Sequence, residues 1–260
     1  MRAIAALLDS RAALGNLRRT LPKGSPRVLA CRSAGGLERV LESRVLEAIV
    51  LGTRVARELP LPALRARFPN IPVVLYGVLR SEDAEELLGW QRLELAAVAL
   101  EGVDDPTIGD LVVRHSLSTR RAAALAEAPR MLRLTEPLQR RTWELLVATL
   151  GRATRTAALA RSLGISREHL SRQFGAGGAP NLKRVGDLLT VHAALQLLGN
   201  PGYSPRAVAR LLGFASPRHL RLVVRRITGA RLAEARKLGE RDLLARFARL
   251  SARSRRRITA

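Results

Sequence analysis

Two segments in the C-terminal half of the sequence repeat one pattern of glycine, serine, histidine and arginine. The first, LGISREHLSRQF, spans residues 163–174, and the second, LGFASPRHLRLVV, spans residues 212–224. The guanidinium group of arginine forms paired hydrogen bonds with carboxylates, with phosphates and with the edge of guanine. A repeated helical display of arginine therefore indicates binding to a polyanion.

The positive charge of the chain is concentrated in the same half. The whole sequence has a formal net charge of +23, of which residues 131–260 contribute +19, from 26 basic and 7 acidic residues. Residues 1–130 hold 19 basic and 15 acidic residues. This asymmetry predicts that a polyanion binds the second half of the chain.

The first copy predicts two short helices joined by a tight turn. Residues 156–163 place alanine and leucine at helical spacing, and Gly164 marks the end of that helix. Ser166 is suited to cap the next helix, which buries Leu170 and Phe174 four residues apart. Two short helices that meet at a glycine form a helix-turn-helix pattern.

The second copy follows the same design. A helix over residues 204–212 ends at Gly213. Ser216 caps the following helix, which has Pro217 at its first position. Between the copies, residues 183–198 are apolar enough for a buried connecting helix. A rigid connection can hold two helices about one turn of DNA apart, ~34 Å, so that they enter successive major grooves.

Three stretches of this half resemble the AraC/XylS-type transcription regulators. They are LQRRTWELLVATL, ALARSLGISREHLSRQF and AVARLLGFASPRHLRLVVRRITG. The resemblance runs from about Leu138 to Leu238 and implies an all-α domain with two helix-turn-helix motifs that binds double-stranded DNA. The sequence departs from the family at Leu220, where an aromatic residue is usual, and at Leu222, where relatives often have a polar residue.

Side-chain chemistry suggests a role for each exposed basic residue of the two copies. Arg172, Arg218 and Arg221 are candidates for paired hydrogen bonds to guanine, and Ser171 for a bond to a base or a phosphate. Contacts to phosphate, which position the protein without reading sequence, are expected from Arg167, Arg225, Arg226, Lys183 and Arg184. His169 and His219 recur at one motif position, and we interpret them as packing or capping residues rather than metal ligands.

The first half alternates short apolar runs with amphipathic helical segments. This alternation is typical of a parallel sheet that is covered by helices on both faces. We expect a five-stranded, doubly wound α/β domain of the flavodoxin or receiver type, closed by a helix near residues 107–116. Its strands are expected at residues 3–8, 27–31, 47–51, 72–76 and 96–100.

The arrangement resembles the response-regulator receiver domain, most closely in FPNIPVVLYG. That resemblance implies a phosphorylation site, but most of its chemistry is missing. Asp9 is the one carboxylate after the first strand, and Gly52 stands at the phosphoacceptor position. Tyr76 or Gly77 replaces the hydroxyl residue, and Glu101 replaces the lysine. We therefore expect a receiver-like domain that is not phosphorylated and that serves in dimerisation or signal input.

Nothing in the sequence predicts an enzyme, a cofactor or a metal site. A glycine-rich phosphate loop of the usual spacing and a G-x-S-x-G elbow are both missing. Asp104 and Asp105 precede Pro106 and Thr107, and we interpret them as the solvated start of a helix. The single cysteine, Cys31, rules out a disulfide framework and is expected in the core.

The predicted organisation has four parts. They are a receiver-like domain (1–118), a linker helix (119–136), a double helix-turn-helix domain (137–238) and a basic tail (239–260). We expect a cytoplasmic transcription regulator that binds double-stranded DNA and has no membrane segment, with a homodimer as a candidate assembly. Two alternatives remain, a protein-interaction adaptor and a nucleoid-type DNA binder of low specificity.

Overall fold

The computed structural model describes residues 2–150 and 156–256. These residues fall into two compact units. One comprises the residues up to Arg120 together with Asn200–Gly202, and the other comprises Arg121–Gly199 and the residues from Tyr203 onward. We call the first the α/β unit and the second the helical unit. None of the described helices is both long enough and apolar enough to cross a membrane.

Five strands in the described part of the α/β unit form one parallel sheet. Its order, β2-β1-β3-β4-β5, is that of a flavodoxin-like doubly wound fold. The strands lie close to the predicted apolar runs, so the predicted fold class is confirmed. They are β1 (Arg2–Leu7), β2 (Arg27–Ala30), β3 (Val45–Leu51), β4 (Val73–Gly77) and β5 (Ala97–Leu100).

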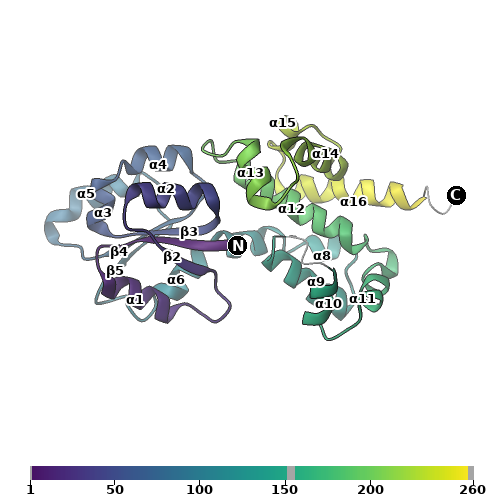
Figure 1. Ribbon diagram of the computed structural model, residues 1–260, viewed down its shortest axis with the longest axis horizontal. Coiled ribbons are helices and arrows are strands. Elements are labelled where there is room, and N and C mark those ends of the chain that lie inside the picture. The colour runs from purple at the N-terminus through teal and green to yellow at the C-terminus, as the bar shows by residue number, and fades with distance from the viewer. Residues whose placement is uncertain (1, 151–155, 257–260) are drawn as a thin grey trace. The chain divides into compact units, whose positions relative to one another are not determined.

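Helices cover both faces of this sheet (Figure 1). Residues of α1 and α6, among them Leu17 and Ile108, pack with Ile4, Val50 and Val74 in the core of one face. The other face is covered by α2 and α3, which contact β1 and β4. The helices of this unit are α1 (Arg11–Thr20), α2 (Ala34–Ser43), α3 (Thr53–Glu58), α4 (Leu61–Arg67), α5 (Ala84–Gln91), α6 (Ile108–His115) and the 3-10 turn η1 (Ser81–Asp83).

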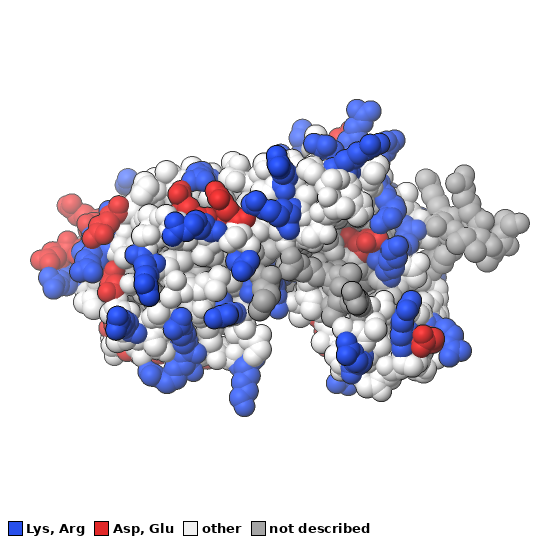
Figure 2. Space-filling view, viewed as in Figure 1, with Lys and Arg blue, Asp and Glu red and all other residues white. Residues whose placement is uncertain are grey.

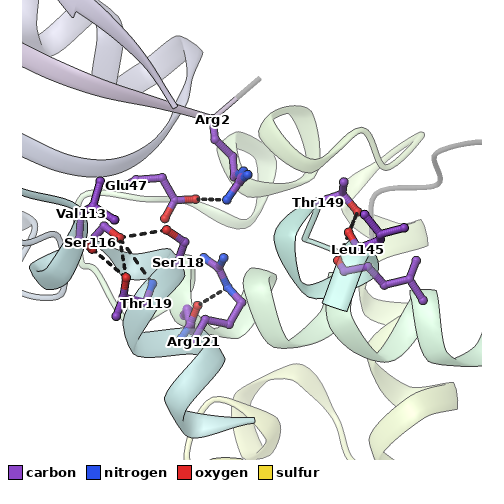
Figure 3. A network of polar contacts seen from close by, with 11 residues as sticks. Arg2, Glu47, Val113, Ser116, Ser118, Thr119, Arg121, Leu145 and Thr149 are labelled. Atoms are coloured by element: carbon purple, nitrogen blue, oxygen red, sulfur yellow. Dashed lines mark hydrogen bonds and ion pairs between the residues drawn. The ribbon is translucent and has the colours of Figure 1, made fainter. Parts of the chain in front are cut away.

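The central strand β3 is buried along its whole length, and this includes one carboxylate. Glu47 is 0% exposed, and Arg2 of β1 forms an ion pair with it at 3.4 Å (Figure 3). A buried carboxylate is costly without such a partner. The ion pair between Arg2 and Glu47 therefore supports the register of β1 beside β3, together with apolar packing.

The helical unit is built around α12, and several of its helices pack directly against it. Val185, Leu188 and Val191 of α12 are fully buried. This helix contacts α9, α13, α14 and α16. The helices are α7 (Leu117–Ala124, which crosses from the first unit), α8 (Ala128–Met131), α9 (Pro137–Ala148), α10 (Thr156–Ser162), α11 (Arg167–Phe174), η2 (Ala176–Gly178), α12 (Leu182–Leu198), α13 (Pro205–Leu212), α14 (Pro217–Thr228), α15 (Leu232–Ala235) and α16 (Glu240–Arg256).

Three sequence expectations need correction. The segment 119–136 is not a single linker helix, because it holds the end of α7 and all of α8. Leu125 between these helices and Ala128 of α8 are buried. The segment 239–260 does not begin as a tail, because α16 buries Leu243, Leu244 and Phe247. Residues 257–260 of that predicted tail lie outside the described residues. Cys31 is half-buried rather than a core residue.

Candidate nucleic-acid interface

Helices α10 and α11 form the first motif, residues 156–174. Gly164 between them has φ +69°, a left-handed conformation that glycine adopts without a Cβ clash. Ser166 caps α11, because its Oγ accepts a hydrogen bond from the backbone N–H of His169 at 3.1 Å. Leu170 and Phe174 are both fully buried. The opposite side of α11 is therefore turned to solvent.

Helices α13 and α14 form the second motif, residues 205–228. Gly213 has φ +76°, and Ser216 Oγ accepts a hydrogen bond from the backbone N–H of His219 at 3.0 Å. The ring of His219 packs edge-on against Phe214, with 5.8 Å between the ring centroids. Buried apolar residues at helical spacing, beginning with Leu220, hold α14 against the unit. Both motifs thus fold by the same caps and turns.

A buried glutamine holds the end of α11 in place. Gln139 of α9 is 1% exposed, and its Nε2 donates to the backbone carbonyls of Phe174 at 3.0 Å and Ala176 at 3.2 Å. These carbonyls would otherwise be unsatisfied at the helix terminus. Sequence reasoning missed this residue, since a glutamine within an amphipathic helix carries no signal of its tertiary partner.

The predicted DNA-binding side chains lie on three helices of this unit. Eight of the nine are exposed, and Arg184 is half-buried. They are Arg167, Ser171 and Arg172 on α11, Lys183 and Arg184 on α12, and Arg218, Arg221, Arg225 and Arg226 on α14.

Two of these arginines are held by neighbouring side chains. Arg226 Nη2 lies 2.7 Å from Asp187 Oδ2, and the guanidinium carbon of Arg184 lies 5.6 Å from the centroid of the Phe247 ring. Burial raises the pKa of Asp187, and the charge of Arg226 opposes this shift. The pair orients Arg226, while α16 supplies the ring beneath Arg184. Neither partner was predicted from the sequence, because each comes from a different helix.

A buried histidine lies on the helix that joins the two motifs. His192 of α12 is 2% exposed, and neither of its ring nitrogens has a hydrogen-bond partner in the described part of the chain. Burial, with a smaller contribution from the charge of Arg121, lowers its pKa to about 4. Arg121 is also buried and donates from Nε to Gln196 Oε1 at 3.3 Å. Figure 3 shows Arg121 in this contact. His192 is therefore neutral at pH 7.

The carboxyl ends of the strands in the α/β unit form a second polar cluster. Asp9 accepts hydrogen bonds from the backbone N–H groups of Arg54 at 3.1 Å and Val55 at 3.0 Å, in the first turn of α3. A Cβ atom at Gly52 would lie 2.4 Å from Asp9 Cγ. The Asp9 carboxylate therefore occupies the space that a side chain at position 52 would need. Ser10 Oγ donates to Glu101 Oε1 at 2.9 Å.

The loop between β5 and α6 closes over Tyr76. The Tyr76 hydroxyl donates to Asp105 and accepts from Asn16 Nδ2 at 3.2 Å. Burial, followed by the bond to Asp105, raises the pKa of Tyr76 to about 12. Asp104 accepts from the backbone N–H of Leu100 at 2.7 Å. The prediction that Asp104 and Asp105 form a solvated helix start is wrong, because both carboxylates bind within their own unit.

The two units differ in how charge covers their surfaces. On the face drawn in Figure 2, basic side chains are spread over the helical unit. Acidic side chains on the same face lie mostly on the α/β unit, with one group near α5 and another near α2. The excess of basic residues in the second half of the sequence therefore appears as a helical unit with few acidic side chains on its surface.

Residues 159–238 match the model of a helix-turn-helix domain family. This segment is similar to the AraC-type helix-turn-helix domains. The matched segment begins within α10 and continues through the second motif, and domains of this family belong to DNA-binding transcription regulators.

Other comparisons add little. A search of solved structures finds full-length FixJ from B. japonicum, which is 14% identical and covers 82% of this chain and 98% of that chain. The TM-score is 0.37, so the fold of the α/β unit is argued from its own strand order alone. A comparison with curated proteins finds no match.

Proposed function

We propose that the protein is a cytoplasmic, sequence-specific transcription regulator whose helices α11 and α14 enter successive major grooves of DNA. The observation that carries the proposal is the repeated motif. Each copy buries its apolar side, is capped by a serine and turns basic residues to solvent. Since α12 contacts α14 directly and α11 through α9, one rigid helix relates the two. We call α11 and α14 the recognition helices.

The proposed contacts divide into reading and anchoring. Arg172, Arg218 and Arg221 read guanine through two hydrogen bonds each, and Ser171 donates to a base or a phosphate. The arginine–aspartate pair and the Phe247 ring support anchoring roles for Arg226 and Arg184, because both guanidinium groups are held near a fixed position. Arg167, Lys183 and Arg225 complete the phosphate contacts.

Paired binding measurements test this division. Arg172→Ala and Arg218→Ala are each expected to weaken binding to a selected duplex by about 1–3 kcal/mol, with much smaller losses on a scrambled duplex. Lys183→Ala is expected to weaken both duplexes alike and to lower the slope of log affinity against log salt by about 1. Arg32→Ala removes one exposed arginine from the α/β unit and serves as the control. Equal losses on both duplexes for Arg172→Ala and Arg218→Ala would favour the low-specificity alternative.

We further propose that the α/β unit is not phosphorylated. In the receiver fold that its sequence resembles, the acceptor follows the third strand, and Gly52 stands there without a reactive side chain. The clash of a Cβ with Asp9 supports the proposal, because the space is already filled by a carboxylate bound to α3. Treatment with a small phosphodonor should leave the mass of the protein unchanged. A stable acyl phosphate at any residue of this unit would refute the proposal.

The α/β unit is proposed to form a homodimer through the side of its sheet that ends in β5. Five of the large apolar side chains that are exposed in the described residues fall between positions 87 and 103, on α5, β5 and the next loop. They are Leu87, Leu88, Val98, Leu100 and Val103. An edge strand leaves backbone groups unpaired, and an apolar surface beside it favours pairing with a second copy. Two weakly binding domains gain avidity when they are joined.

Sedimentation velocity tests the dimer. The wild-type protein is expected to sediment as a dimer, and Leu88→Asp as a monomer with weaker DNA binding. Leu222→Asp places the same charge change on an exposed leucine of the helical unit and should remain dimeric. A monomeric wild type, or a dimeric Leu88→Asp protein, would contradict this interface.

A further inference from the structure

One exposed leucine stands among the arginines of α14. Leu222 is 57% exposed, whereas the other large apolar side chains described in the helical unit are buried or half-buried. A single exposed leucine is common on protein surfaces and needs no explanation by itself. Its position on the helix is the informative part.

Leu222 lies on the same side of α14 as the proposed reading residues. It follows Arg218 by four positions and precedes Arg225 by three, and Arg221 is its neighbour in sequence. Residues three or four positions apart share one face of an α-helix, so Leu222 shares its face with Arg218 and Arg225, and Arg221 lies beside that face. The buried residues Leu220 and Val223 lie on the other side. Leu222 therefore points toward whatever the arginines of α14 contact.

The first motif has a different residue at the corresponding position. When the capping residues Ser166 and Ser216 are matched, Leu170 falls on Leu220, and Arg172 falls on Leu222. A hydrogen-bond donor in the first recognition helix is thus replaced by a purely apolar side chain in the second. Apolar side chains recognise one group in the major groove, the C5-methyl of thymine.

We propose that Leu222 is a specificity-determining residue that contacts the C5-methyl group of a thymine in the half-site bound by α14. The inference rests on the proposed DNA-reading function and adds to it a base preference at one position. The surrounding arginines favour DNA over a protein partner, because they bring phosphates to both sides of the leucine. Van der Waals contact and the removal of the methyl group from water supply the preference.

Replacing thymine by deoxyuridine tests this contact, because the two bases differ only in the C5-methyl group. The probe is the duplex that the wild-type protein prefers from a random pool, with each thymine replaced in turn. Wild-type affinity, measured by fluorescence anisotropy, should fall roughly fourfold at one position of the α14 half-site. Leu222→Ala should bind more weakly and show no further loss at that position. Thermal denaturation of Leu222→Ala should match the wild type, which excludes unfolding as the cause.

A change of preference provides a second, independent readout. Leu222→Arg recreates the arrangement at Arg172 and should shift the preferred base at the same position from thymine to guanine. Arg172→Ala serves as the control and should keep the full effect of deoxyuridine in the α14 half-site.

The outcomes separate the two proposals. A selective wild type with no deoxyuridine effect, or with an effect that Leu222→Ala retains, overturns the inference and leaves the proposed function standing. In that case a protein partner becomes the better explanation of the exposed leucine. A wild type with no sequence preference at all overturns both.

Discussion

Leu170 of α11 and Leu220 of α14 occupy one motif position, and both side chains are fully buried. The capping serines, Ser166 and Ser216, also match, with cap hydrogen bonds of 3.1 and 3.0 Å. Apart from His169 and His219, the exposed residues of the two helices differ. Where α11 has Glu168, Ser171 and Arg172, α14 has Arg218, Arg221 and Leu222.

The packing of the two helices differs as well. Helix α11 has 8 residues and contacts α9 and α10, while α14 has 12 residues and contacts α12, α13, α15 and α16. The buried and capping positions hold both helices in the same way, and we call these positions the common frame. The exposed positions decide what each helix binds. The following predictions test this separation, beginning with the frame.

The largest effect is expected from the matched buried leucines. Leu170→Ala and Leu220→Ala should each lower the free energy of unfolding by about 2–5 kcal/mol, because each leaves a cavity among buried apolar side chains. Urea denaturation followed by circular dichroism gives both values. A loss under about 0.5 kcal/mol for either variant would show that the two motifs do not share one frame.

Acid should weaken both motifs together through His192. The folded protein binds a proton at His192 with a pKa of about 4, below the ordinary value of 6.5 that applies in the unfolded chain. Stability is therefore lost as the pH falls from about 6.5 toward 4, by up to about 3 kcal/mol.

Urea denaturation midpoints measured across that pH range show how stability changes with pH. His192→Leu should make the free energy of unfolding less dependent on pH. The losses measured for Leu170→Ala and Leu220→Ala at pH 7 give the scale against which the acid effect is compared. A wild-type slope that His192→Leu leaves unchanged would place the acid sensitivity in another group.

A smaller effect is expected from the caps. Ser166→Ala and Ser216→Ala should each cost about 1 kcal/mol, since each leaves one backbone N–H of the first turn without its partner. Ser166→Asp and Ser216→Asp keep an acceptor and should retain most of the stability. If Ser166→Ala and Ser216→Ala lost very different amounts of stability, the two caps would not be equivalent.

The smallest effect on stability is expected at Leu222. Because this side chain is 57% exposed, Leu222→Ala should change the free energy of unfolding by less than about 0.5 kcal/mol. Any loss of DNA affinity in this variant then belongs to the surface and not to the frame. A loss of stability comparable to that of Leu220→Ala would show that Leu222 belongs to the common frame and not to the binding surface.

Much of the fold could be predicted from local pattern. Apolar runs marked the strands, and Gly164, Gly213 and the capping serines marked the turns, because these signals act within a few residues. Helix α16 was missed although Leu243, Leu244 and Phe247 have helical spacing, since arginine dominates the composition of that segment. Its apolar stripe indicated a packed helix more strongly than its charge indicated a tail.

Contacts between distant segments could not be predicted. The sequence identified Asp9 only as the one carboxylate after the first strand, and it did not predict that Asp9 accepts hydrogen bonds from the first turn of α3 beside Gly52. Asp105 was expected in solvent, but it accepts the Tyr76 hydroxyl. In both cases the partner lies far along the sequence, and only the tertiary fold brings the two together. The partners of Arg184 and Arg226 have the same origin.

Selection of duplexes from a random pool tests the central claim most directly. If α11 and α14 read successive major grooves, the selected sequences should contain two short preferred blocks whose centres lie about 10 base pairs apart. Arg172→Ala should erase one block and Arg218→Ala the other. A single block, a variable spacing or no preference would contradict the account.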